Sequence, residues 1–219
     1  MAQALNEPRH GRLRPGSCRL CRAFDCESPA ELAPGVVRLL DAFPVVPGHE
    51  LMLTTQHAGS IAMAARSGLD LERLQAELLP DDAAPRLLLE HGVPSARPRS
   101  ECIDHAHIHM LPGVAASLDT LLSAPSFAFA RAASLNSVDL QHLDSAVGNA
   151  EYVWICDSSG DSVVVEVSAS MAVPSQLARR AVAETLGLRG WDWRRSLALR
   201  GALPTSRLGS RFDREFCAS

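Results

Sequence analysis

Three of the eight histidines stand at every second position of one short segment, IDHAHIHMLP, residues 103–112. In a β-strand, side chains two positions apart point to the same face and lie about 6.6–6.8 Å apart. A strand here would therefore place the imidazoles of His105, His107 and His109 in a row, with mostly apolar side chains on the opposite face. Imidazole can ligate a metal ion, transfer a proton or act as a nucleophile. Three of them on one face predict a chemical site rather than three ordinary core histidines.

A catalytic zinc ion bound by all three imidazoles is one interpretation, since three histidines and a water are a common catalytic zinc set. Three successive positions on one strand face, however, are too far apart to converge easily on a single ion. This spacing argues against a single ion shared by all three histidines.

The stretch His-Ala-His-Ile-His-Met-Leu (105–111) resembles the motif of the histidine triad family, in which three histidines alternate with apolar residues. The similarity continues upstream, where LLDAFPVVPGHELMLTTQH (39–57) resembles the family's Asp, its Pro-x-His, an apolar strand and a further His. LLLEHG (87–92) resembles the strand before the triad in one bacterial branch. The match covers residues 18–112, and it is typical of a zinc-containing bacterial type with a C-terminal extension.

The resemblance implies an enzyme that binds a nucleotide, a purine nucleotide by family habit, and cleaves a bond at its α-phosphate. His107 would be the nucleophile and form a nucleotidyl-histidine intermediate, while His109 and His49 would contact phosphate. Asp41 would accept hydrogen bonds from the ribose hydroxyls, and Phe43 would flank the base. A nucleotide hydrolase passes the nucleotide to water, a nucleotidyltransferase to another acceptor and a phosphorylase to inorganic phosphate. A non-catalytic nucleotide- or zinc-binding module is the alternative from another class.

The sequence departs from the family pattern around the phosphate site. Ser100 and Cys102 stand where the family often has a small Gly or Ser, and we expect both to contact the substrate. We expect His91 to line the cleft near the phosphates. The basic residue that the family often has near TTQH is absent, so the phosphate contacts would come from other arginines, namely Arg99, Arg179 or Arg180.

Cys18 and Cys21 have the spacing of a zinc-ligand pair, and a structural tetrahedral site needs two further N or S ligands. In zinc-containing members of the family, a histidine near the position of His57 and the first triad histidine complete the set. The resemblance therefore implies a structural zinc ion held by Cys18, Cys21, His57 and His105. Such an ion would stiffen the strand that carries His107. Two buried thiols without a metal are the alternative.

The remaining sequence predicts the elements that position these residues. Strands are predicted at 35–43, 48–57, 85–92, 102–112, 151–156 and 162–168, and helices in 59–79 (two, separated by Gly68), 113–123, 137–146 and 174–187. Strands and helices mix without a regular βαβ alternation. This pattern favours an α+β fold, an antiparallel sheet with flanking helices, plus a C-terminal α/β extension. We expect a mobile segment at 1–17, a catalytic core at 18–115 and an extension at 116–219 that packs on the core.

Composition narrows the class of partners. The 219-residue chain has a net charge of −4, and all 21 of its basic residues are arginine. No general positive field attracts nucleic acid. No apolar run approaches 18 residues and no signal sequence is visible, so we expect a cytoplasmic protein without a membrane span or disulfide framework. Small family members pair their sheets, which implies a homodimer unless the extension blocks that pairing.

Overall fold

The computed structural model describes residues 18, 20–21, 29–80, 84–93, 105–132, 135–168, 171 and 173–192. The predicted mobile segment 1–17 lies outside this part of the chain. So do the expected substrate contacts Ser100 and Cys102 and the candidate phosphate contact Arg99.

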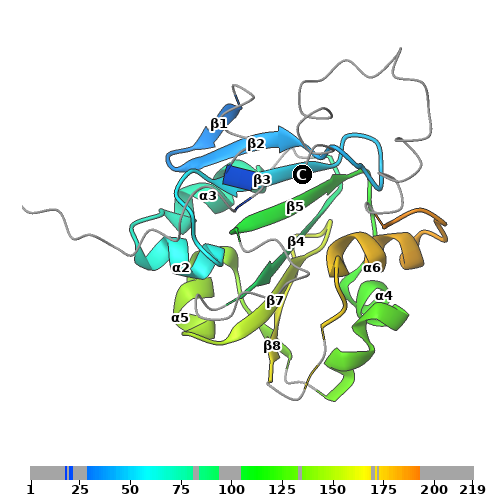
Figure 1. Ribbon diagram of the computed structural model, residues 1–219. Coiled ribbons are helices and arrows are strands. Elements are labelled where there is room, and N and C mark those ends of the chain that lie inside the picture. Colours follow the sequence, from blue (N-terminus) through cyan, green and yellow to red (C-terminus); the bar gives the residue numbers. More distant parts are fainter. Residues whose placement is uncertain are drawn as a thin grey trace, which may run out of the picture.

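Within the described residues, eight strands form one sheet in the order β1-β2-β3-β5-β4-β7-β8-β6 (Figure 1). The strands are β1 (Ala30–Ala33), β2 (Val36–Leu40), β3 (Glu50–Thr54), β4 (Arg86–Gly92), β5 (His107–Pro112), β6 (Leu135–Ser137), β7 (Glu151–Cys156) and β8 (Ser162–Val167). Each of these neighbouring pairs is antiparallel. The predicted α+β class with an antiparallel sheet is confirmed. The hairpin β7–β8 continues the same sheet beyond β4.

Short helices connect the strands. They are α2 (Ile61–Arg66), α3 (Leu71–Leu78), α4 (Leu118–Leu122), α5 (Leu143–Val147) and α6 (Leu177–Thr185), with the 3₁₀ helices η1 (Pro125–Ala132) and η2 (Leu140–His142). Ser60 caps α2 by accepting a hydrogen bond from the Met63 N–H at 3.2 Å, and Asp70 caps α3 in the same way. Gly68, with φ of +106°, lies between these two helices, as predicted. Among the described helices, none is long and apolar enough to cross a bilayer.

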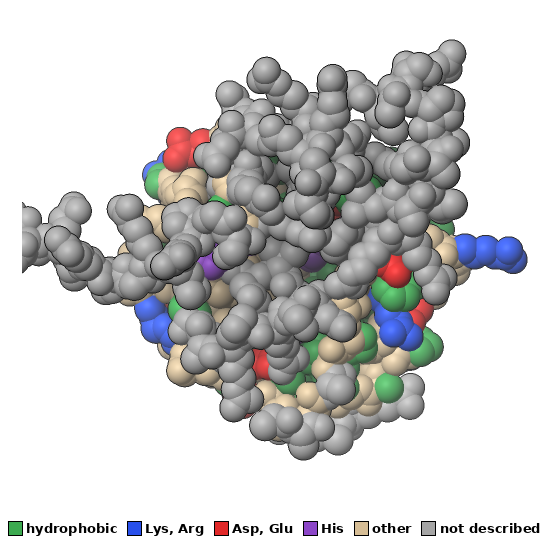
Figure 2. Space-filling view, viewed as in Figure 1, with side chains coloured by type: hydrophobic (Ala, Val, Ile, Leu, Met, Phe, Trp, Pro, Cys, Tyr) green, Lys and Arg blue, Asp and Glu red, His purple; other side chains and the backbone are tan. Residues whose placement is uncertain are grey.

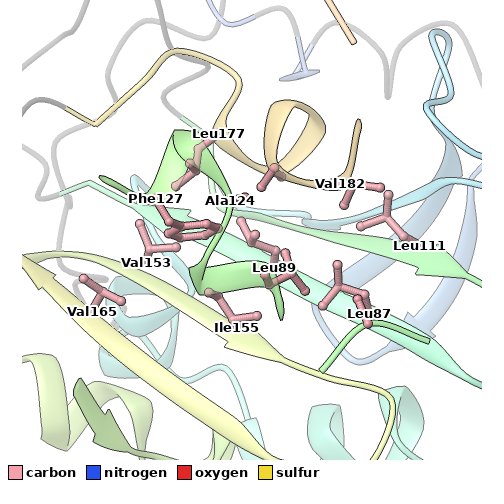
Figure 3. Close-up of a cluster of buried hydrophobic side chains, with 14 of the residues drawn as sticks. Leu87, Leu89, Leu111, Ala124, Phe127, Val153, Ile155, Val165, Leu177 and Val182 are labelled. Atoms are coloured by element: carbon pink, nitrogen blue, oxygen red, sulfur yellow. The ribbon is translucent and has the colours of Figure 1, made fainter. Parts of the chain in front are cut away.

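The helices cover both faces of the sheet (Figure 1). On one face, Leu88, Met52 and Ile108 pack in a cluster with side chains of α2, α3 and α5. On the other face, side chains from β4, β5, β7 and β8 pack against α4, η1 and α6 (Figure 3). This second layer includes Leu111, and strand alternation places His107 and His109 on the same face as Leu111. We call it the histidine face. Figure 2 shows histidine side chains at two places on the side of the molecule turned to the viewer.

Strand β5 is shorter than predicted. It begins at His107, so His105 precedes the strand and the expected row of three imidazoles does not form. The Ala106 N–H donates to the Ala58 carbonyl at 2.6 Å, and the Thr54 N–H donates to the Ala106 carbonyl at 3.3 Å. The bond from Thr54 continues the β3–β5 register by one residue, whereas the Ala106 N–H turns to the Ala58 carbonyl and leaves the ladder. The His105 side chain lies with the two cysteines described below.

A buried carboxyl group stabilises the face opposite the histidines. Glu90 Oε1 accepts from the Ile61 N–H at 2.6 Å, and Glu90 Oε2 accepts from the Tyr152 hydroxyl at 2.7 Å. The tyrosine ring fits because residue 92 is glycine: a Cβ there would lie 2.3 Å from Tyr152 Cζ. Burial raises the pKa of Glu90 from 4.5 to about 7, against the opposing effect of these two hydrogen bonds.

This raised pKa makes folding stability depend on pH. Between pH 4.5 and about 7 the Glu90 carboxyl binds more protons in the folded chain than in the unfolded chain, so its contribution to the free energy of unfolding falls as pH rises. The expected loss is about 3 kcal/mol by pH 8, at about 1.4 kcal/mol per pKa unit. Glu90→Gln lacks this contribution, so the difference in free energy of unfolding between the wild-type chain and the variant should change by this amount across pH 4.5–8, as measured by urea unfolding. Glu166→Gln, an exposed position on β8, should keep the wild-type slope; an unchanged slope in Glu90→Gln would contradict the assignment.

Candidate active site

The loop between β2 and β3 brings Asp41 and His49 together. The Asp41 N–H donates to the His49 carbonyl at 2.9 Å, and this bond joins the two ends of the loop. Gly48 has φ of +75°, a conformation that glycine adopts without strain, and a Cβ there would lie 3.1 Å from Pro112 Cγ. The spacing of the Asp and the Pro-x-His in the sequence therefore corresponds to the two ends of one hairpin loop.

The register of β3 and β5 then places His49 beside His109. Leu51 of β3 pairs with His109 of β5, and His49 lies two positions before Leu51 on the same side of the chain. His49 Nε2 lies 2.9 Å from His109 Nδ1. Both imidazoles belong to the histidine face, next to the ring of His107, whose centroid is 4.9 Å from that of His109.

The backbone fixes which nitrogen of His107 carries hydrogen. Its Nδ1 lies 2.6 Å from the carbonyl oxygen of His105. A carbonyl only accepts, so Nδ1–H donates, and Nε2 of a neutral ring keeps its lone pair. Burial lowers the pKa of His107 below its usual 6.5, outweighing the hydrogen bond to His105 and the nearby Asp41. At neutral pH this ring is uncharged, with Nε2 unprotonated.

The contacts of His49 and His109 favour hydrogen on Nε2 of each ring, in contrast to His107, which carries it on Nδ1. The Val45 N lies 3.4 Å from His49 Nδ1, and when its N–H donates to that nitrogen, His49 Nε2–H donates to His109 Nδ1. The hydrogen of His109 is then on Nε2, where it is a donor. Burial lowers the pKa of His49 to about 4 and that of His109 well below 6.5. In this arrangement the site offers an unprotonated Nε2 on His107 and an Nε2–H donor on His109.

Arg179 of α6 completes this group from a distant part of the chain. Its Nη1 donates to Asp41 Oδ2 at 2.7 Å, its Nε donates to the Trp191 carbonyl at 3.0 Å, and its Nη2 donates to the Phe43 carbonyl. The side chains of Arg179 and Asp41 are 7% and 8% exposed, so the ion pair is buried. The sequence suggested Arg179 only as a phosphate contact, and no local pattern indicated a partner 138 positions away.

Two other predicted substrate contacts, Phe43 and His91, lie among the described residues near the histidines. Phe43 is buried, and its N–H donates to Asp41 Oδ1 at 2.7 Å. His91 of β4 lies on the histidine face, and its Nε2 is within hydrogen-bond distance of Glu151 Oε1 of β7, at 2.9 Å. Arg180 points elsewhere, toward Glu184 and the ring of Trp191.

The four predicted metal ligands lie together at the other end of the triad segment. Cys21 Sγ lies 3.3 Å from His57 Nδ1 and 3.4 Å from His105 Nδ1, and Cys18 Sγ lies 3.5 Å from His105 Nδ1. A zinc tetrahedron with usual bond lengths has S···N edges of about 3.6 Å. The four residues can therefore hold a metal ion.

The surroundings of His105 support this arrangement. Its Nε2 lies 2.7 Å from the Thr54 carbonyl oxygen, so Nε2–H donates and Nδ1 presents a lone pair to the sulfur atoms. Asp41, His49 and His109 form a second group with ligand atoms within 4.8 Å. There, however, Arg179 already neutralises the carboxylate and a hydrogen lies between the two imidazoles, which disfavours a cation.

Known proteins resemble this chain only in structure, and at low similarity. No family model matches the sequence, and no curated protein matches it. The structure is similar to yeast Ap4A phosphorylase Apa2, with a TM-score of 0.39 and 15% identity over 66% of this chain and 60% of that chain. For the same phosphorylase in complex with AMP, the TM-score is 0.38 and the identity 18%, over 65% of this chain and 60% of that chain. For its complex with Ap4A, the TM-score is 0.33 and the identity 13%, over 61% of this chain and 57% of that chain. The chain thus spans about 60% of the length of that enzyme, and the geometry of the site alone carries the proposal below.

Proposed function

We propose that this chain is a histidine triad enzyme that cleaves a nucleotide at the α-phosphate, with His107 as the nucleophile. The observation that carries the proposal is the 2.6 Å contact between His107 Nδ1 and the His105 carbonyl. It leaves the lone pair of Nε2 for attack on phosphorus. Covalent catalysis of this kind divides one displacement into two easier steps.

In the first step, His107 Nε2 attacks the α-phosphorus and an N–P bond forms. The bond between phosphorus and the leaving group breaks, and its electron pair departs with that group. The donor Nε2–H of His109 lies two strand positions away on the same face and can hydrogen-bond a non-bridging phosphate oxygen. Donors that are fixed before the reaction stabilise the charge that develops on these oxygens.

In the second step, an acceptor attacks phosphorus and the N–P bond breaks, which returns neutral His107. Water as the acceptor makes the enzyme a hydrolase, another acceptor makes it a nucleotidyltransferase, and inorganic phosphate makes it a phosphorylase. We propose Asp41, Phe43 and His91 as substrate contacts, together with Ser100 and Cys102. A carboxylate has about four acceptor positions, so Asp41 retains capacity for ribose hydroxyls beside its present partners.

Replacement of His107 tests the covalent mechanism. Since the variant lacks the attacking nitrogen, His107→Gly should lose at least ~10³-fold in kcat on a nucleoside phosphoramidate or a dinucleoside polyphosphate. Product analysis by mass spectrometry, with and without inorganic phosphate, identifies the acceptor. The matched control His142→Gly alters an exposed histidine of η2 and should retain activity. Full activity in His107→Gly would rule out the mechanism, and nucleotide binding without turnover in the wild-type chain would favour a binding module.

We also propose that Cys18, Cys21, His57 and His105, here called the metal group, hold a structural zinc ion. Two thiolates and two imidazoles form a usual zinc set, and the measured S···N distances suit a tetrahedron. When bound, the ion would link the segment of Cys18 and Cys21 to the start of β5. His105, whose carbonyl accepts from His107, would then be held at both its side chain and its backbone.

Metal analysis tests this second proposal. The purified chain should contain about one zinc per chain, and Cys21→Ser should lose it together with at least about 2 kcal/mol of stability. For a chain of this size that corresponds to a Tm lower by about 4–8 °C. Cys156→Ala removes a buried thiol of β7 outside the metal group and should keep the zinc. A wild-type chain without bound metal after purification in zinc-containing buffer would exclude the site.

A further inference from the structure

We propose that Arg179 fixes the tautomers of His49 and His109 through its ion pair with Asp41. Arg179 would then be a positioning residue, contributed to the histidine site by α6. Its effect on turnover rests on the proposed function, whereas the tautomers are a property of the folded chain that can be measured without a substrate.

Two groups compete for one nitrogen of His49. The Val45 N lies 3.4 Å from His49 Nδ1, and Asp41 Oδ2 lies 3.5 Å from the same atom. The backbone N–H needs a lone pair on Nδ1, whereas a carboxylate oxygen needs a hydrogen there. Only one of these contacts can be a hydrogen bond at a time.

The tautomer of His49 determines the tautomer of His109, because the two rings share one hydrogen bond. If Nδ1 of His49 accepts from Val45, then Nε2–H donates to His109 Nδ1, and His109 keeps its hydrogen on Nε2. If Nδ1 of His49 donates to Asp41, then Nε2 accepts from His109 Nδ1–H, and His109 Nε2 is unprotonated. Each neutral ring holds one hydrogen in both arrangements, so they differ only in hydrogen positions. Only the first gives the histidine face an N–H donor beside His107.

Arg179 decides between the two arrangements by its charge. Its Nη1 lies 2.7 Å from Asp41 Oδ2, the same oxygen that faces His49. A guanidinium at this distance reduces the attraction of the carboxylate for the His49 hydrogen, and the effect is strong because the pair is buried. The arrangement with Val45 is then favoured.

The guanidinium is held in place by its other contacts. It donates to the carbonyl oxygens of Phe43 and Trp191. The Trp191 segment is itself held by Gln176, the residue before α6, whose Nε2 donates to Asp192 Oδ1 at 3.0 Å. Desolvation keeps both histidines uncharged at neutral pH, as their lowered pKa values indicate, so the choice lies between tautomers.

Long-range ¹H–¹⁵N NMR of ¹⁵N-histidine-labelled protein tests the proposal, since protonated and unprotonated ring nitrogens have well-separated shifts. The wild-type chain should show Nε2–H on both His49 and His109. Arg179→Gln should move the hydrogen to Nδ1 in both. The matched control Arg180→Gln, at the next position of α6, should keep the wild-type tautomers.

Arg179→Gln leaves a buried carboxylate unpaired and can fail to fold. The double variant Asp41→Asn/Arg179→Gln carries neither charge, and without a carboxylate it should return to the wild-type tautomers. A hydrogen on His49 Nδ1 in the wild-type chain or in the double variant would overturn the proposal. So would a folded Arg179→Gln variant with unchanged tautomers.

The kinetic consequence is measured on the same variants. Because the His109 donor acts on charge that develops during the reaction, Arg179→Gln should lower kcat about 10–100-fold and change KM less than about threefold. Arg179→Lys keeps the charge and should restore most of kcat. A loss in KM alone would show that Arg179 binds the substrate directly and contradict its role as a positioning residue. Loss of the proposed function would remove the turnover readout while leaving the NMR result intact.

Discussion

The antiparallel register between β3 and β5 is the constraint on which the site depends. The pairing of Leu51 with His109 and of Leu53 with His107 fixes which side chains lie next to each other on the histidine face. A shift of one residue would move both imidazoles to the opposite face, where Ile108 and Met52 now fill the core. The loss of those buried apolar contacts would be costly, so packing on one face fixes the chemistry on the other.

The same burial that fixes the register also sets the chemical state of the imidazoles. Desolvation lowers the pKa of His107 and His109, so the site holds neutral rings whose properties depend on hydrogen positions rather than on charge. The His105 carbonyl fixes the hydrogen on His107 Nδ1, and the Val45 N lies 3.4 Å from His49 Nδ1. Arg179 and Asp41 bring a buried pair of opposite charges to the group, and α6 supplies one of them.

Much of this arrangement could be predicted from the sequence because it depends on local patterns. The alternation of histidines with apolar residues predicted a strand with two different faces, and Ile108 and His107 lie accordingly. The motif also pointed to the four possible metal ligands, which the structure brings together. The predicted start of β5 was wrong by several residues, because the Ala106 N–H donates to the Ala58 carbonyl instead of continuing the ladder with β3.

The remaining features depend on tertiary contacts that leave no local pattern. The short strands β1 and β6 lie at the two edges of the sheet and show too few alternating residues to stand out. The 3₁₀ helix η1 lacks the regular α-helical period, and its Phe127 is buried in a cluster that includes side chains of the sheet and of α6. The pairing of Arg179 with Asp41 requires α6 to lie over the β2–β3 loop.

The most direct test of the account is to look for the covalent intermediate on the intact chain. Enzyme mixed with a cleavable nucleotide is quenched within milliseconds at alkaline pH, where an N–P bond to imidazole survives, and its peptides are analysed by mass spectrometry. We expect one added nucleotidyl group on His107, within the peptide that contains residues 105–112. Turnover with no adduct, or an adduct on His105 or His109, would contradict it.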